Sequence, residues 1–285
     1  MSPIILAVAI LGGIGIISAS LLYVVASKFK VTEDPRIEEI ENILPGANCG
    51  GCGFNGCHDF SVTCVKRNSI EGLLCPVGGE KAMTAIADCL GLKAEAVTPK
   101  VAVLKCNGSC MVRKHTTLYD GPRSCAIERI IYAGETDCPF GCLGCGDCVA
   151  ACMFGAVAIN PETMLPEFDE EKCTACGACV NACPSHIIEL RNKGPKGRRV
   201  YVACSNHDRG AVAMRECKVS CIGCGKCAKA CAFGAITVAD NLAYIDYEKC
   251  RLCRKCVDVC PEHCIKAVNF PIPKVKQETT ETAVC

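Results

Sequence analysis

The stretch Cys142-Leu-Gly-Cys-Gly-Asp-Cys-Val-Ala-Ala-Cys152 has the spacing C-x2-C-x2-C-x3-C, which occurs four times in the 285-residue chain. The other copies begin at Cys173, Cys221 and Cys250. Thiolates this close in sequence are awkward disulfide partners but suit a shared metal group, and they need a reducing compartment. A tetrahedral zinc site uses only four ligands. Four copies of a four-thiol run therefore favour iron–sulfur clusters over zinc.

The pairing of the runs predicts how the clusters are held. In a bacterial-type ferredoxin with two [4Fe–4S] clusters, the first three cysteines of a run bind one cluster and the fourth binds the other. Each half of the module therefore needs the other half. Numbering the N-terminal cluster as one, the predicted sets are Cys142, Cys145, Cys148 and Cys183 for cluster two; Cys173, Cys176, Cys179 and Cys152 for cluster three; Cys221, Cys224, Cys227 and Cys260 for cluster four; and Cys250, Cys253, Cys256 and Cys231 for cluster five.

The repeat extends beyond the ligand runs. Residues 101–106 (V-A-V-L-K-C) resemble residues 199–204 (R-V-Y-V-A-C), and Cys138 precedes Cys142 as Cys217 precedes Cys221. Short strands are expected at 156–160 and 235–238. The pattern predicts an α+β fold in which a whole ferredoxin-like unit is duplicated.

A different cysteine pattern lies nearer the N-terminus. Cys49, Cys52 and Cys57 have the spacing C-x2-C-x4-C, and Cys75 follows, next to a proline. Interspersed glycines allow the tight turns that a loop around a cluster needs. Helices are expected at 35–44, 58–67 and 80–90. We predict that these four cysteines bind cluster one in a small, mostly helical domain, with a four-cysteine zinc site as the alternative.

Residues 3–26 carry no charged side chain. As a helix they would extend roughly 36 Å, enough to cross a hydrocarbon core of about 30 Å. A cleaved signal peptide is the alternative, but no positive segment precedes the run. Lys28 and Lys30 follow it. The sequence therefore predicts a single transmembrane anchor with its N-terminus outside and the cluster domains in the cytoplasm.

Five clusters use twenty of the 30 cysteines. Three of the others, Cys106, Cys125 and Cys138, with Cys110 as a fourth, are candidates for one further centre. The interpretation that we favour is that the spare cysteines are small buried residues, with an exposed thiol at the C-terminus. The ten spare cysteines are Cys64, Cys89, Cys106, Cys110, Cys125, Cys138, Cys204, Cys217, Cys264 and Cys285.

No nucleotide-binding glycine motif, phosphate-binding loop or catalytic triad occurs, so we expect no catalytic residues on this chain. The net charge of +1 by itself says nothing about partners, and we expect no nucleic-acid partner. The cluster motifs predict a chain that passes electrons.

The order of the parts resembles the B subunit of the Rnf complex over nearly the full length, and the C-x2-C-x4-C unit also resembles a domain of corrinoid iron–sulfur proteins. The resemblance implies a membrane-bound, ion-translocating (Na⁺ or H⁺) ferredoxin:NAD⁺ oxidoreductase. It implies that this subunit accepts electrons from soluble reduced ferredoxin and passes them to membrane and flavin-bearing partner subunits. Alternatives are the electron-transfer subunit of a membrane hydrogenase or formate-type dehydrogenase, and a metal-stabilised scaffold without a redox role.

Together these patterns predict a transmembrane helix, a small helical cluster domain and two tandem two-cluster ferredoxin-like modules. Two basic groups are candidate docking sites for ferredoxin: Arg191, Lys193, Lys196, Arg198 and Arg199, or Lys249, Arg251, Arg254 and Lys255. The predicted boundaries are 1–27 for the anchor, 28–95 for the four-cysteine domain, 96–137 for a linker with a short strand and helix, 138–190 for the first module, 191–216 for a basic linker and strand, 217–270 for the second module and 271–285 for the tail.

Overall fold

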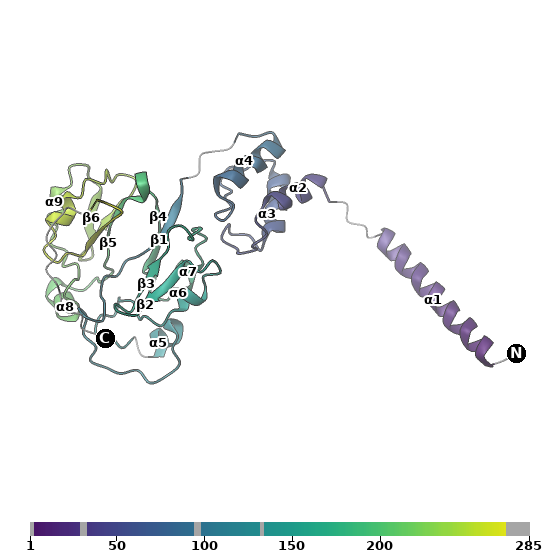
Figure 1. Cartoon of the computed structure of the whole chain (residues 1–285), viewed down its shortest axis with the longest axis horizontal. Coiled ribbons are helices and arrows are strands. Elements are labelled where there is room, and N and C mark those ends of the chain that lie inside the picture. The colour runs from purple at the N-terminus through teal and green to yellow at the C-terminus, as the bar shows by residue number, and fades with distance from the viewer. Residues whose placement is uncertain (1–2, 29–32, 94–97, 132–133, 272–285) are drawn as a thin grey trace.

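The computed structural model describes residues 3–28, 33–93, 98–131 and 134–271. Three parts follow one another along the chain (Figure 1): a long helix, a three-helix unit, and a body of short helices and two-stranded sheets. Most of the predicted tail, with Cys285, lies outside the described residues.

Helix α1 (Pro3–Lys28) extends away from the rest of the chain in Figure 1. Its side chains are described for residues 11–25, 27 and 28, and the apolar ones among them are exposed on every side, Leu11 to 70% and Tyr23 to 75%. Part of the predicted anchor therefore lies outside the described side chains. Within the described residues, no helix meets the length and hydropathy required of a membrane span.

Three helices, α2 (Pro35–Ile43), α3 (Cys57–Arg67) and α4 (Gly79–Leu90), form what we call the N-terminal cluster unit. Asp34 caps α2, since its carboxylate accepts a hydrogen bond from the Arg36 backbone N–H at 3.0 Å. Ile40, Phe60 and Ile86 are almost fully buried between the helices. The three predicted helices are confirmed to within one residue at their ends.

Module one contains the first two cysteine runs. Its hairpin consists of β2 (Val157–Asn160) and β3 (Leu165–Phe168), and its second antiparallel pair of β1 (Lys100–Leu104) and β4 (Ile188–Asn192). The helices α5 (Cys125–Ile131), α6 (Asp147–Ala150) and α7 (Ala178–Ala182) surround these strands. The strand expected after the first run is confirmed.

Module two repeats this order. The hairpin is β6 (Ile236–Ala239) with β7 (Leu242–Ile245), and the second pair is β5 (Arg199–Val202) with β8 (Ile265–Val268). Its helices are α8 (Gly210–Glu216), α9 (Lys226–Ala230) and α10 (Lys255–Asp258), and a 3-10 turn, η1 (Pro195–Gly197), precedes it. The duplication predicted from residues 101–106 and 199–204 is visible as the equivalent strands β1 and β5.

Both predicted linkers contribute a strand to a module. β1 lies in the segment 96–137 and pairs with β4, while β5 lies in the segment 191–216 and pairs with β8. The two modules also share a core at their junction, because side chains of β1 pack against β5 and the residue after it. This shared core consists of Val101, Val103, Tyr201 and Ala203.

Two arginines of the predicted basic linker are buried at this junction. Arg191 is 1% exposed; its guanidinium donates to the Ile245 carbonyl oxygen at 3.0 Å and lies 5.2 Å from the centre of the Tyr244 ring. Arg199 is 7% exposed and pairs with Glu170 at 2.7 Å. A buried charge needs such partners. The interpretation of these two residues as a surface docking site is therefore wrong.

Candidate iron–sulfur cluster sites

Module two contains two cavities of matched size, with empty volumes of about 330 and 340 Å³. Each is lined by three cysteines of one run and the fourth cysteine of the other run. The first is lined by Cys221, Cys224, Cys227 and Cys260, and the second by Cys250, Cys253, Cys256 and Cys231. The spare cysteine Cys264 also lines the first cavity, with its sulfur 3.5 Å from that of Cys260. These are the sets predicted for clusters four and five, so the fold brings both sets together.

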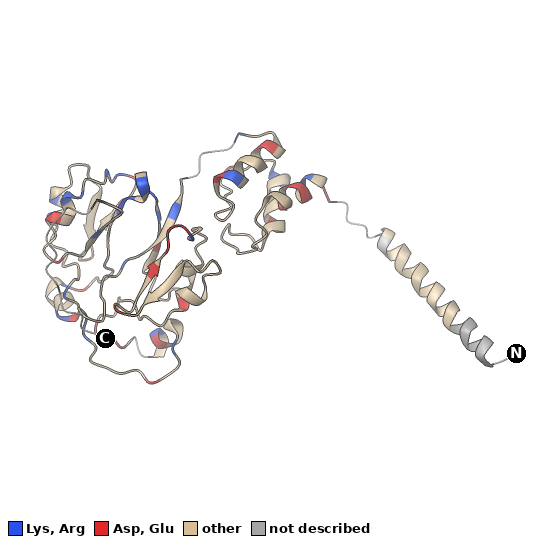
Figure 2. Ribbon diagram, in the orientation of Figure 1, with Lys and Arg blue, Asp and Glu red and all other residues tan. Residues whose placement is uncertain are grey.

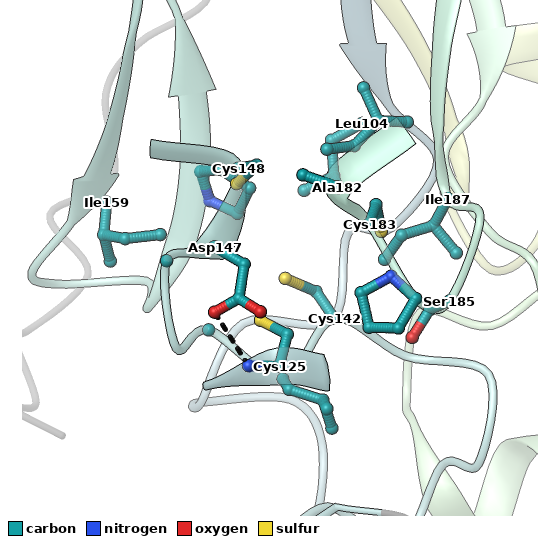
Figure 3. Close-up of a pocket in the computed structure, with 16 residues that line it drawn as sticks. Leu104, Cys125, Cys142, Asp147, Cys148, Ile159, Ala182, Cys183, Ser185 and Ile187 are labelled. Carbon is teal, nitrogen blue, oxygen red and sulfur yellow. Dashed lines mark hydrogen bonds between the residues drawn. The ribbon is translucent and has the colours of Figure 1, made fainter. Parts of the chain in front are cut away.

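The corresponding cavity of module one has an empty volume of about 370 Å³ and is lined by Cys142, Cys148 and Cys183, three members of the set predicted for cluster two (Figure 3). The fourth predicted member, Cys145, is not among its lining residues. Cys125, from α5, lines the cavity instead. Sequence reasoning did not connect Cys125 with this site, because it lies far upstream of the run.

The cysteines predicted for cluster three also converge. Cys179 lies in the short helix α7 and packs in the same core as Cys152 and Cys173. Burial and the nearby charges of Cys173, Cys176 and Cys152, with a contribution from Cys148 of the adjacent site, raise the pKa of Cys179 to about 12. The sites for clusters two and three are therefore neighbours within module one.

In the N-terminal cluster unit, Cys52, Cys57 and Cys75 contribute to one hydrophobic core. Asn48 closes the loop that carries the first three ligands, because its side-chain oxygen accepts a hydrogen bond from the Cys57 backbone N–H at 2.7 Å. Cys49 is half-buried at the start of this loop. Cys64 is fully buried in the core, as expected, whereas Cys89 is only half-buried.

The N-terminal cluster unit contacts module one through its ligand loop. A Cβ atom on Gly51 would lie 2.7 Å from the Cys176 carbonyl oxygen, so only a glycine fits here without displacing backbone. Gly51 stands next to the predicted ligand Cys52, and Cys176 is itself a predicted ligand of cluster three. The protein segments around clusters one and three therefore touch.

The donor atoms at these sites suit iron–sulfur clusters, because every predicted ligand is a thiol and soft thiolates are the ligands of such clusters. Burial raises the pKa of the Cys142 thiol to about 12 and that of Cys148 to about 11. Cluster binding by Cys142 and Cys148 is therefore coupled to proton release. Among the described residues, no group of three or more His, Cys, Asp or Glu side chains is spaced for a single metal ion.

The spare cysteines Cys106, Cys138, Cys204 and Cys217 are all buried. A Cβ on Gly108 would lie 3.6 Å from the Cys106 sulfur and 3.3 Å from that of Cys217. Asn206 lies 3.5 Å from the sulfurs of Cys138 and Cys204. Of the cysteines suggested for a further centre, Cys125 lines the cavity of cluster two, and the further centre stays a prediction.

Comparisons with known proteins agree with this arrangement. A family model for a 4Fe-4S dicluster domain matches residues 141–187 and 220–264, and a model for an Fe-S cluster matches residues 44–72. The chain is 43% identical to the B subunit of the Na⁺-translocating ferredoxin:NAD⁺ oxidoreductase complex of Acetobacterium woodii, over 93% of this chain and 78% of that protein. It is 37% identical to the B subunit of the ion-translocating oxidoreductase complex of Methanosarcina acetivorans, over 93% and 98%. It is 34% identical to the B subunit of the proton-translocating ferredoxin:NAD⁺ oxidoreductase complex of Clostridium ljungdahlii, over 99% of both proteins.

Proposed function

This chain belongs to the B-subunit family of ion-translocating ferredoxin:NAD⁺ oxidoreductase complexes, and we propose on this premise that it carries electrons from reduced ferredoxin to membrane partner subunits. It is an iron–sulfur electron-transfer subunit of such an oxidoreductase. The proposal includes five [4Fe–4S] clusters and no catalytic residue on this chain.

The observation that carries the proposal is the composition of the two cavities in module two. Each contains four thiols from two separate runs, in the combination that a two-cluster ferredoxin requires, and the cavity of cluster four is also lined by the spare thiol of Cys264. The same exchange of ligands applies to clusters two and three in module one, and Cys49, Cys52, Cys57 and Cys75 hold cluster one. A scaffold with no redox role has no need for adjacent cluster sites in series.

The proposed electron path runs from module two through module one to the N-terminal cluster unit. Contact between Gly51 and Cys176 supports the last step, since it brings the ligand loops of clusters one and three together. The packed junction of β1 and β5 supports the step between modules. The path ends at the unit that directly follows α1 (Figure 1).

When bound, the clusters supply one-electron redox chemistry. The protein tunes it through hydrogen bonds and charges near the sulfurs, which favour the more negative, reduced state. The backbone N–H groups of Ala156 and Gly78 donate to the sulfurs of Cys152 and Cys75, both at 3.3 Å. The buried guanidinium of Arg113 donates to the carbonyl oxygen of Cys142 and places a positive charge beside cluster two.

We place the ferredoxin docking site on module two, at cluster five. The ligand Cys253 is exposed, so an electron donor can approach this cluster closely. Lys249, Arg251 and Lys255 around it are exposed and positively charged (Figure 2). An acidic ferredoxin would be attracted to this surface, which we call the cluster-five basic surface.

We also propose that the protein is held in the cytoplasmic membrane by residues 3–26, with the N-terminus outside. The exposed apolar side chains of α1, such as Ile16 and Leu22, have no partner among the described residues, and this supports the proposal. Deleting residues 1–28 should move the protein from the membrane fraction to the soluble fraction of an anaerobic lysate with its cluster absorbance intact. Retention in the membrane in the absence of partner subunits would contradict the anchor.

Mixing the anaerobically purified chain with reduced ferredoxin tests the electron-transfer function. The visible absorbance of the oxidised clusters should bleach in a stopped-flow instrument, and added zinc-substituted ferredoxin, which carries no electron, should cause no change. A chain that contains its clusters but is not reduced by ferredoxin would refute the proposed donor.

A further inference from the structure

We propose that electrons cross from module two to module one between clusters four and two, and that Arg113 is the positioning residue for this step. The inference rests on the proposed function, because it assumes that both modules bind [4Fe–4S] clusters and pass electrons. It deepens that function by naming the two clusters at which the modules exchange electrons. The alternative is a step from cluster five to cluster three.

The backbone of Arg113 is attached to module two. It belongs to a short segment, residues 112–114, which we call the strap and which pairs with residues 216–218. Arg113 forms an antiparallel bridge with Cys217, and backbone hydrogen bonds of 3.2 and 3.0 Å flank this bridge on its two sides. Residue 218 is three positions before Cys221, the first predicted ligand of cluster four. The strap is therefore fixed to the segment that leads into cluster four.

The side chain of Arg113 extends from the strap to cluster two. Its guanidinium donates to the carbonyl oxygen of Cys142, the first predicted ligand of that cluster. The side chain passes close to two glycines: a Cβ atom on Gly108 would lie 3.2 Å from the Arg113 Cδ, and one on Gly141 would lie 3.5 Å from its Nη1. One residue thus connects the segment before cluster four with the ligand run of cluster two.

Arg113 is a buried cation. It is only 5% exposed, and in the described part of the chain no carboxylate forms an ion pair with it. Its Nε atom is also buried without a hydrogen-bond partner among these residues. A buried positive charge is costly unless a negative charge compensates it. A cluster held by four thiolates is negative and becomes more so on reduction, so Arg113 stabilises the reduced state of cluster two more than the oxidised state.

Module two differs at the equivalent place. Residues 205–216 follow Cys204 as the strap region follows Cys106. This segment contains two arginines, Arg209 and Arg215, and both are exposed. Solvent and salt screen an exposed charge far more than a buried one. The arginine of the strap therefore favours the reduced state at cluster two over that at cluster four, and an electron that moves from cluster four to cluster two moves downhill.

A second buried connection joins the same two sites. Asn206 is 1% exposed; its side-chain amide lies 3.5 Å from the Cys138 sulfur, and its backbone N–H lies 3.5 Å from the Cys204 sulfur. The Cys221 N–H donates to the Cys204 sulfur at 3.3 Å, and the Gly141 N–H donates to the Cys138 carbonyl oxygen at 3.2 Å. Hydrogen bonds and covalent bonds therefore run without a break from the first ligand of cluster four to the residue before the first ligand of cluster two.

Clusters five and three are separated by a sheet. Cys173, a predicted ligand of cluster three, packs against the shared core that contains Tyr201. Val200, the preceding residue of β5, lines the cavity of cluster five. Successive residues of a strand face opposite sides of its sheet. The pair β5–β8 thus lies between these two clusters, which favours the step from cluster four to cluster two.

A redox titration followed by EPR tests the role of Arg113 in the full-length chain, purified anaerobically. Arg113→Met keeps an apolar stem but removes the charge. It should shift the equilibrium of cluster two about tenfold toward the oxidised state, which is a midpoint potential lower by about 59 mV. Arg113→Lys should keep most of the original potential, because the charge remains. Lys114→Met is the matched control, since it removes the same charge from an exposed neighbour in the strap, and it should leave the potential unchanged.

Rapid-freeze EPR after mixing with reduced ferredoxin tests the route. Cys224→Ala removes a predicted ligand of cluster four and should cost about four irons. Cluster five should still be reduced in this variant, whereas reduction of clusters one to three should slow at least tenfold. Rapid reduction of cluster three would overturn the proposed route in favour of the alternative. Arg113→Met, which keeps all ligands, should slow reduction of clusters one to three while clusters four and five are reduced at the usual rate.

The outcomes separate this inference from the proposed function. An unchanged potential of cluster two in Arg113→Met at full iron content, or an equal shift in Lys114→Met, would overturn the role of Arg113 and leave the proposed function intact. Failure of ferredoxin to reduce the unsubstituted, cluster-loaded chain would instead refute the proposed function.

Discussion

Replacing Arg191 by alanine should loosen the junction between the two modules. Arg191 comes from β4 of module one, and its guanidinium donates to the carbonyl oxygen of Ile245, at the end of β7 in module two. Three aromatic rings surround the guanidinium at 5.2 to 5.8 Å, those of Tyr201, Tyr244 and Tyr247. The substitution removes all of these interactions from a buried site.

The size of the effect follows from the interactions that the guanidinium makes. A hydrogen bond from a charged donor contributes about 1.5–3 kcal/mol, and the cation–π contacts add about 0.5–2 kcal/mol. Glu189, the acidic neighbour of Arg191 at 3.5 Å, keeps Lys105 and the Tyr244 hydroxyl as partners, so no unpaired buried charge is left. We therefore expect Arg191→Ala to lower the free energy of unfolding by about 3 kcal/mol, which for a body of this size corresponds to a melting temperature lower by about 6–12 °C.

The assay is anaerobic thermal unfolding followed by circular dichroism at one fixed scan rate, because a cluster protein unfolds irreversibly. Arg215→Ala is the matched control, since Arg215 is exposed and its loss should change stability by less than about 0.5 kcal/mol. Arg191→Lys should fall between the two, because lysine keeps the charge but loses the planar fork. A melting temperature of Arg191→Ala within about 2 °C of the control would refute the role assigned to this arginine.

Two further predictions concern the electron path. Reversing charge at the cluster-five basic surface with Arg251→Glu and Lys255→Glu should slow reduction by ferredoxin about tenfold or more at low salt. The effect should fade at high salt, because exposed charges act on the association rate and are screened by salt. Equal slowing by the distant reversal Lys81→Glu, or slowing that does not depend on salt, would refute this docking site. Gly51→Val should displace the loop of cluster one from Cys176, since the added carbon would meet that residue's backbone. Reduction of cluster one, measured by EPR after rapid freezing, should then slow, while clusters two to five are reduced at the usual rate. An unchanged rate of reduction of cluster one would contradict the claim that electrons pass between these two loops.

Local spacing in the sequence predicted the parts of this structure that depend on a few neighbouring residues. Three ligands within one run are near one another in any compact loop, and the exchange of the fourth ligand follows from the ferredoxin pattern. The cysteines predicted for clusters four and five accordingly line shared cavities, and their role as ligands stays a prediction. The capped helix beginning at Pro35 was predicted for the same reason, because its signals are adjacent in sequence.

Long-range packing decided what the sequence could not predict. Cys125 lies in no ligand run, and only the bonds between Asp147 and the start of α5 bring it to the cavity of cluster two. Arg191 and Arg199 belong to a charged segment typical of a solvated linker, yet both are buried, Arg191 on β4, which pairs with β1, and Arg199 on β5, which pairs with β8. Their partners, Ile245 and Glu170, are remote in sequence, so no local pattern indicates the burial.

The central claim is that five cysteine sets hold five [4Fe–4S] clusters in one chain. The most direct test is the amount of iron, acid-labile sulfide and zinc per chain in the full-length protein purified without oxygen. We predict about twenty irons and about twenty sulfides, no stoichiometric zinc, and EPR signals of reduced [4Fe–4S] clusters. Zinc in place of iron, or fewer than about sixteen irons in a preparation with intact visible absorbance, would contradict the claim.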